Sequence, residues 1–190
     1  MAPHSIVIMG RPGSGKGTQA EFLAQKLGAR VVSLGKEFRS LAAGTTYLGK
    51  KLKTALDAGE LMPTWFADYL CEKELLFLEP WEKVVFDSGC RIKSEAELFH
   101  DIHAWLERDY LVVYIDVSEA EIQSRIAKRQ TLEDRADDVH TSLRKRIDEF
   151  ETKTTLSLQY FESIEKLVRI PGEASIEEVQ TAILKSLNLE

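Results

Sequence analysis

The sequence predicts an α/β protein in which a five-stranded parallel sheet is covered by helices on both faces. Two observations predict this class: five short apolar runs rich in β-branched residues, and segments with helical spacing between them. Parallel strands that are buried on both faces typically appear as such continuous apolar runs. A third observation supports it, because a glycine-rich loop joins the first expected strand to the first expected helix.

Expected strands and helices alternate along most of the chain. The five strands are expected at residues 5–9, 30–34, 83–87, 111–117 and 166–170. Helical patterns occupy residues 18–27, 95–108, 119–128, 139–150 with a continuation toward 164, and 175–187. Gly28 follows the first of these patterns, as is typical of a helix C-terminus. Strands that alternate with helices across short loops indicate a parallel sheet.

Residues 36–78 interrupt the alternation, because no strand pattern separates the second expected strand from the third. The segment has helical patterns at residues 37–43, 47–58 and 66–77 instead. Periodicity leaves open whether this helical insert is a packing element or a moving lobe. Since the chain contains no repeat, low-complexity stretch or linker, we expect one domain over residues 1–190.

The composition is that of a globular domain. The chain has 190 residues, of which 44% are hydrophobic and 29% are charged, and its net charge is −6. These values exclude a disordered chain and argue against nonspecific binding of nucleic acid. No apolar run approaches the roughly 18 residues that span a membrane, and the first residues lack a signal-peptide pattern. We therefore expect a cytoplasmic protein that contacts neither nucleic acid nor membrane.

Several side chains that carry chemistry elsewhere are interpreted here as structural. Cys71 and Cys90 are too few for a disulfide framework or a four-cysteine zinc site, and we expect them to be buried or half-buried. His100 and His103 have a spacing that could hold a metal, but no third ligand accompanies them, which predicts a solvated helix face. Packing roles in the core or at its edge are expected for the tryptophans, Trp65, Trp81 and Trp105.

The strongest motif is the glycine-rich loop at residues 10–18, Gly-Arg-Pro-Gly-Ser-Gly-Lys-Gly-Thr, which has the P-loop spacing G-x-x-x-x-G-K. Its glycines let the backbone curl so that several N–H groups point into one concavity. The helix N-terminus adds partial positive charge and Lys16 a full one. The G-x-G-x-G spacing excludes a dinucleotide fingerprint. The residues expected around nucleotide phosphates are Gly10, Pro12, Gly13, Ser14, Gly15, Lys16, Gly17 and Thr18.

One position departs from the general P-loop. Gly17 stands where a Ser or Thr usually supplies a hydroxyl ligand to Mg²⁺. A carboxylate elsewhere must then help to hold the metal, together with the phosphates and water. Asp87 ends the third expected strand, and carboxyl ends of parallel strands meet on the P-loop side of a sheet. Asp87 is therefore the natural candidate for this carboxylate.

Arginines form the second cluster of candidate site residues. Arg91 follows the third expected strand, and Arg125 and Arg129 lie four residues apart on one helix face. Guanidinium groups suit phosphate oxygens and stay charged throughout turnover, as phosphoryl transfer requires. The arginines considered are Arg39, Arg91, Arg125, Arg129, Arg135, Arg144 and Arg146.

These motifs, in this order, resemble the adenylate kinase group of nucleoside monophosphate kinases. The P-loop with its G-K-G-T ending, the S-L-G-K-E-F-R segment at residues 33–39 and the stretch at residues 44–63 look like that group's sequence. Residues 87–91, Asp-Ser-Gly-Cys-Arg, stand where the group has D-G-F-P-R, and the segments at 125–129 and 135–146 look like those flanking its lid. The correspondences are collinear over essentially the whole chain.

The resemblance implies a P-loop NTPase fold with a helical monophosphate-binding insert at about residues 35–78. A short lid is implied at about 130–135, without zinc. The core would then comprise about residues 1–34, 79–129 and 136–190. The implied activity is Mg²⁺-dependent transfer of the terminal phosphoryl group of ATP to AMP by a monomer that closes over both nucleotides.

The resemblance also implies the role of each site residue. Lys16 would follow the transferred phosphoryl group, Arg125 would pack on the donor base and Arg129 would contact donor phosphates. Catalytic roles are implied for Lys16, Asp87, Arg91, Arg129, Arg135 and Arg146. AMP would be bound by Leu34, Gly35, Arg39, Leu61, Met62, Arg91, Glu95, Arg135 and Arg146.

Four departures from the group's pattern surround the acceptor. Lys36 replaces an aspartate near the metal's water shell, and Leu34 replaces a small hydroxyl residue. Residues 88–90 replace Gly-Phe-Pro, and Glu95 replaces a glutamine that reads the adenine edge. A carboxylate accepts hydrogen bonds but cannot donate them as an amide does. The alternatives left open are therefore a kinase for UMP, CMP or GMP, a P-loop kinase for another small molecule, and a nucleotide-binding homologue with weak catalysis.

Overall fold

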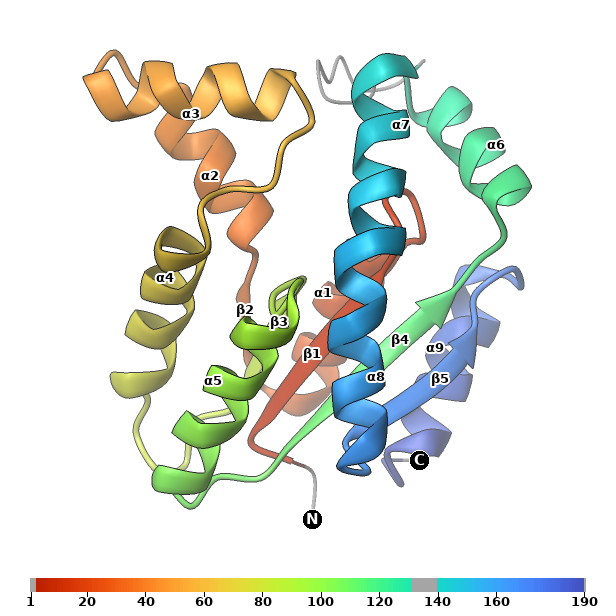
Figure 1. Ribbon diagram of the computed structural model, residues 1–190. Coiled ribbons are helices and arrows are strands. Elements are labelled where there is room, and N and C mark those ends of the chain that lie inside the picture. Colours follow the sequence, from red (N-terminus) through yellow and green to blue (C-terminus); the bar gives the residue numbers. More distant parts are fainter. Residues whose placement is uncertain (1–2, 131–139, 190) are drawn as a thin grey trace.

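The computed structural model describes residues 3–130 and 140–189 and contains a five-stranded, entirely parallel sheet (Figure 1). The strands are β1 (Ser5–Gly10), β2 (Arg30–Val32), β3 (Val84–Asp87), β4 (Tyr110–Asp116) and β5 (Leu167–Pro171). Their order across the sheet is β2-β3-β1-β4-β5, so the P-loop strand lies at the centre. The predicted α/β class is confirmed.

Helices connect the strands and also form the insert. The sheet helices are α1 (Lys16–Leu27), α5 (Lys93–Trp105), α6 (Glu119–Gln130), α7 (His140–Glu149), α8 (Thr155–Ser163) and α9 (Ile176–Ser186). The insert between β2 and β3 contains α2 (Leu34–Ala42), α3 (Tyr47–Asp57) and α4 (Thr64–Leu76). Figure 1 shows these three helices together on the left of the sheet. The expectation of a helical insert without strands is confirmed for this segment.

The core consists of two apolar layers, one on each face of the sheet. Side chains alternate along β1, so Val7 and Met9 join one layer while Ile6 and Ile8 join the other. The first layer includes side chains of α2, α4, α5 and α8, and the second includes those of α1, α6, α7 and α9. Helices therefore cover both faces, as the apolar strand patterns predicted.

Two elements differ from the sequence prediction. The second strand ends at Val32 rather than at residue 34, because the Ser33 side chain caps α2 by accepting a hydrogen bond from the Lys36 N–H. The expected long helix after residue 139 is interrupted by η2 (Phe150–Thr154), a π-helical turn between α7 and α8. Both differences bring side chains to the pocket described below.

Two structural interpretations of the sequence are wrong. His103 is 1% exposed rather than solvated. Its ring nitrogens bond to the Phe99 carbonyl and to Ser5 Oγ, each at 2.8 Å, because α5 packs this face against β1. The three tryptophans are exposed at 68%, 76% and 78% rather than packed in the core.

The cysteine interpretation holds in the structure. Cys90 is buried and Cys71 is half-buried, and burial raises the pKa of both thiols. Within the described ranges, no helix is long and apolar enough to cross a membrane.

Candidate functional site

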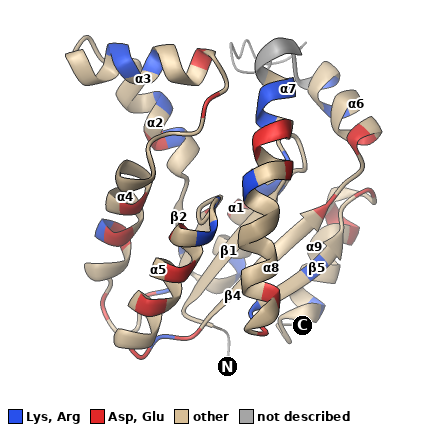
Figure 2. Ribbon diagram, viewed as in Figure 1, with Lys and Arg blue, Asp and Glu red and all other residues tan. Residues whose placement is uncertain are grey.

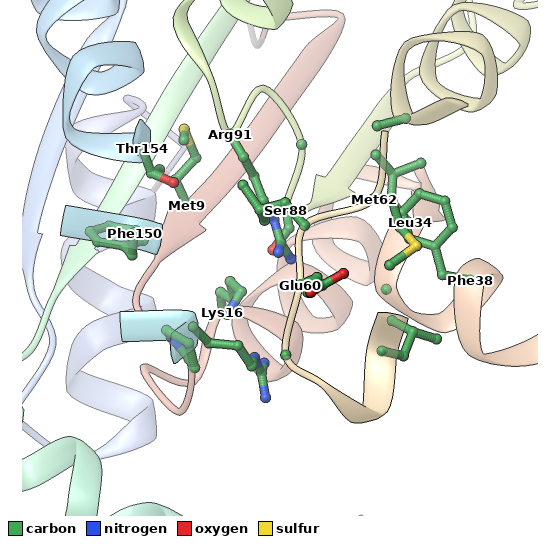
Figure 3. A pocket seen from close by; sticks show the side chains of 18 of the residues that line it. Met9, Lys16, Leu34, Phe38, Glu60, Met62, Ser88, Arg91, Phe150 and Thr154 are labelled. Carbon is green, nitrogen blue, oxygen red and sulfur yellow. The ribbon is translucent and has the colours of Figure 1, made fainter. Parts of the chain in front are cut away.

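One pocket joins the carboxyl ends of the central strands to the helical insert (Figure 3). Met9, Gly10, Pro12 and Lys16 border it on the P-loop side. The other lining residues come from α2, α3, the α3–α4 connection, α4, the β3–α5 loop, α5 and the α7–η2 helix. A parallel sheet is expected to bind ligands at this edge.

Backbone conformation explains why the P-loop needs its glycines. Gly13 and Gly15 have φ angles of 85° and 89°, in the left-handed region that favours glycine. A Cβ on Gly10 would lie 2.9 Å from the Ile115 carbonyl oxygen of the neighbouring strand. Gly15 caps α1 without a side-chain hydrogen bond, so the first N–H groups of the helix point into the loop. The loop therefore presents backbone donors to an anion.

Lys16 and Gly17 begin α1 beside this loop. Lys16 is half-buried and lines the pocket, and its Nζ donates to the Arg11 carbonyl oxygen at 3.3 Å. A Cβ on Gly17 would lie 3.3 Å from Asp87 Oδ2, so glycine at this position allows the carboxylate to approach the P-loop. Glycine at position 17 therefore lacks the usual hydroxyl group but leaves room for the Asp87 carboxylate beside the P-loop.

Asp87 lies at the carboxyl end of β3, on the P-loop side of the sheet. It ends β3, next to β1 in the sheet, and its Oδ2 accepts a hydrogen bond from Ser33 Oγ at 2.8 Å. Carboxylate oxygen is a ligand or water acceptor suited to Mg²⁺. Among the described residues, no group of three or more His, Cys, Asp or Glu is arranged to hold a metal ion directly.

The structure brings three of the predicted arginines to the pocket. Arg39 comes from α2, Arg91 from the β3–α5 loop and Arg146 from α7, and all three are half-buried. Figure 3 shows Lys16 and Arg91 reaching toward the middle of this pocket. Figure 2 shows further basic residues on α3 and α7, which border the same end of the molecule. The pocket is therefore suited to more than one phosphate group.

The remaining arginines take other places. Arg125 lies over the back of the P-loop, where its guanidinium donates to the Ser14 carbonyl at 3.3 Å and to the Gly172 carbonyl at 2.8 Å. Arg144 is exposed and pairs with Glu119 and Asp148, so it faces solvent. Arg129 belongs to α6, but its side chain and all of Arg135 lie outside the described residues.

An apolar wall forms the end of the pocket that the helical insert provides. The predicted residues Leu34, Gly35, Leu61 and Met62 all line it. Sequence reasoning missed Phe38, Leu56 and Ala67 in this wall, and it missed Phe150, which lines the pocket from η2. Phe38 lies one helical turn after Leu34, so the period of α2 was a signal that could have found it.

Comparisons with known proteins agree with this geometry. The family model described as adenylate kinase matches residues 8–166. An adenylate kinase of Thermus thermophilus is 33% identical over 186 residues, covering 97% of each chain. Those of Chlamydia felis and Thermobifida fusca are each 31% identical, with 94% and 96% of this chain covered and 94% and 97% of theirs.

The chain belongs to the adenylate kinase family. The resemblance predicted from the sequence is thereby confirmed, together with the fold that it implied. The matched range contains the P-loop, the insert and every pocket-lining residue.

Glu95, which departs from the family pattern, binds the backbone at the start of α5. Its Oε2 accepts hydrogen bonds from the Arg91 N–H at 2.6 Å and from the Ile92 N–H at 3.4 Å, at the start of α5. Burial raises the pKa of this carboxyl group, although the hydrogen bond from Arg91 opposes the shift. One oxygen of Glu95 is thus committed to holding the backbone that carries Arg91.

The loop between β3 and α5 has an unusual backbone. Ser88 and Cys90 have φ angles of 70° and 51°, and Gly89 has a φ of 147°. Non-glycine residues rarely adopt such angles, and they persist where surrounding contacts hold them. Ser157 of α8 donates a hydrogen bond to the Cys90 carbonyl and provides one such contact. The replaced residues 88–90 therefore still present Arg91 to the pocket.

Lys36 does not line the pocket. Its Nζ lies 2.6 Å from Glu21 Oε1 of α1, and its side chain is 62% exposed. The positive charge that replaces the family's aspartate is therefore neutralised beside the pocket by a carboxylate of this chain.

Proposed function

We propose that this chain transfers the terminal phosphoryl group of ATP to AMP and so produces two ADP. The observation that carries the proposal is the meeting of Lys16 with Arg39, Arg91 and Arg146 around one pocket. Two nucleotides whose phosphates meet there bring several negative charges, which these cations offset. Relatives named adenylate kinase over nearly the full chain support AMP as the acceptor.

The proposed mechanism assigns positioning and charge neutralisation to the protein. The backbone N–H groups of the P-loop hold the donor phosphates, and Lys16 follows the phosphoryl group as it moves. Arg39 and Arg91 hold the acceptor phosphate, while Arg146 bridges the transfer zone. Phosphoryl transfer needs little further covalent chemistry from the enzyme.

The apolar wall and three further arginines complete the proposal. Leu34 and Met62 would contact the acceptor base, and Arg125 would lie against the donor base. Arg129 and Arg135 would add positive charge when the lid covers the site. Asp87 would orient Mg²⁺ through water, and the ion when bound supplies neutralisation of the ATP phosphates.

Closure of the insert at 35–78 and of the short lid at about 130–135 over the core belongs to the proposal. Such closure excludes the water that would otherwise hydrolyse ATP. Lys145 of α7 lies 2.9 Å from Glu60 Oε1 in the α3–α4 connection, and opening of the insert would break this pair. We further propose a cytoplasmic monomer that needs no zinc, nucleic acid or membrane.

The test compares acceptors in parallel. The protein is incubated with ATP, Mg²⁺ and one of AMP, GMP, CMP or UMP, and diphosphate formation is followed. We expect rapid ADP formation with AMP alone. Preference for another monophosphate would instead assign a sister specificity and point to Leu34 and Glu95. Tight ATP binding without turnover of any acceptor would overturn the proposed reaction.

A further inference from the structure

Arg11, the second residue of the P-loop, has no role in the proposed mechanism and does not line the pocket. Its guanidinium lies between the end of β4 and the π-helical turn η2. Nη2 and Nε lie 2.6 Å and 2.8 Å from the same oxygen of Glu151, which belongs to η2. Nη1 donates to the Val117 carbonyl at 3.1 Å and lies 3.4 Å from Asp116 Oδ1. One side chain therefore joins a strand end to a helix.

Aromatic packing strengthens the same junction. The Arg11 guanidinium carbon lies 5.6 Å from the centroid of the Phe150 ring, and that ring stacks on Tyr114 with centroids 6.1 Å apart. Arginine suits such a place, because its planar group can stack on a ring while donating several hydrogen bonds in a fixed geometry. Lysine has neither property.

The turn that Arg11 contacts, η2, carries two residues that line the pocket. Phe150 and Thr154, the ends of η2, both line the pocket (Figure 3). Arg146 lines it from the preceding turn of the helix. Single π-helical turns often occur at functional sites because they reorient side chains within a continuous helix. Here Glu151, next to Phe150, is directed to Arg11. The position of η2 consequently sets the position of Arg146.

The backbone of Arg11 contacts Lys16, the other cation that the proposed mechanism uses. Its carbonyl accepts hydrogen bonds from Lys16 Nζ at 3.3 Å and from the Ser14 N–H at 3.1 Å. The same residue thus contacts the P-loop lysine through its backbone and the helix of Arg146 through its side chain.

We propose that Arg11 is a positioning residue that holds Arg146 in register with Lys16 by clamping η2 to the P-loop strand end. This inference rests on the proposed function, since it assigns both cations to one transfer step. The clamp acts on geometry rather than on nucleotide affinity, because the P-loop N–H groups do not depend on the Arg11 side chain. Its loss therefore reduces kcat more than it raises the KM for ATP.

A double-mutant cycle tests the clamp with Arg11→Met, Glu151→Gln and the double variant. We expect each single variant to lose about tenfold in kcat, because small displacements of catalytic groups have effects of this size or larger. The KM for ATP should change by less than about twofold. The double variant should be no slower than Arg11→Met, because that variant has already lost the contact with Glu151. Arg11→Lys, which keeps the charge but loses the fork, should fall between wild type and Arg11→Met.

Arg169→Met is the matched control. Arg169 is also bound to a carboxylate, that of Glu162 at 3.1 Å, and lies 5.4 Å from the Tyr114 ring centroid, but it contacts neither η2 nor the P-loop. Its kcat should equal that of wild type. Thermal unfolding of every variant shows that the rates refer to folded protein.

Two results would overturn the clamp. The first is a wild-type kcat in folded Arg11→Met. The second is independence of the two residues, in which the kcat loss of the double variant equals the product of the two single losses; a loss seen in only one single variant is such a case. Either result with an active wild type leaves the proposed function intact. Failure of wild type to convert AMP would instead overturn the proposed function itself.

Discussion

The proposed donor and acceptor halves of the pocket are built in different ways. The donor half is one contiguous stretch, residues 10–18, in which positive φ angles and a helix N-terminus create the phosphate site locally. The acceptor half collects α2, the α3–α4 connection and the β3–α5 loop, which are distant in sequence. Three of the four departures from the family pattern, at Leu34, residues 88–90 and Glu95, fall in the second half, whereas Lys36 lies outside the pocket. A site made by one segment is constrained by backbone geometry, whereas a site made by several segments can exchange side chains while its contacts are rebuilt.

The largest effect is expected in the donor half. Lys16→Met removes the positive charge that follows the phosphoryl group, and kcat should fall by at least about a hundredfold, as for other single groups that stabilise a transition state. The measurement is ADP formation at saturating ATP and AMP. Lys26→Met, in the last turn of the same helix, is the control and should keep the wild-type rate. Full activity of Lys16→Met would show that the donor half works differently from the proposal.

The second prediction concerns the stability of the fold at His103, which does not line the pocket. Burial lowers the pKa of His103 to about 4 from an ordinary value of 6.5. The unfolded chain therefore binds the proton more tightly, and stability is lost as pH falls from about 6.5 to about 4. The lost free energy of unfolding approaches about 3 kcal/mol for a shift of this size. Below the lower value this contribution becomes constant.

Denaturant unfolding between pH 7 and pH 4 measures this effect, with His103→Leu as the reference. The variant is less stable at pH 7, because Ser5 Oγ and the Phe99 carbonyl lose a partner. It also lacks the titrating group, so its curve should fall less steeply than that of wild type. Parallel curves would contradict a neutral, buried His103.

A smaller effect is expected at Glu95 in the acceptor half. Glu95→Leu removes the acceptor for the Arg91 and Ile92 N–H groups, and the KM for AMP should rise by about fivefold, in the range of a lost hydrogen bond. Glu95→Gln keeps an oxygen in that place, so its KM for AMP should stay close to the wild-type value. Equal effects of both variants would show that the charge of Glu95, rather than its backbone contacts, matters.

The smallest effect is expected at Lys36. Because this side chain pairs with Glu21 and does not line the pocket, Lys36→Asp should change kcat by less than about threefold, as for an exposed ion pair. A Mg²⁺ titration of the rate is the measurement, and Lys53→Asp, which breaks another exposed pair, is its control. A large gain in rate would show that Lys36 weakens the metal site, contrary to the geometry.

Sequence patterns predicted the strands and helices closely, because each depends on periods and caps within a short segment. The second strand ends earlier than predicted because the Ser33 side chain caps the start of α2. The wrong interpretations have a common reason. A histidine on a helix and a tryptophan in an apolar segment have no intrinsic burial, which depends on what packs against each face.

The sequence by itself determined the P-loop, the parallel sheet and the family, since these depend on contiguous motifs and on their order. Only the tertiary structure decided which distant groups meet. It placed Asp87 against Gly17, Glu95 beneath the backbone of Arg91, and Arg11 against Glu151. The physical reason is that hydrogen bonds and ion pairs act over a few ångströms in space. Spacing along the chain specifies such contacts within one turn or loop, whereas packing of the sheet and helices specifies them between remote segments.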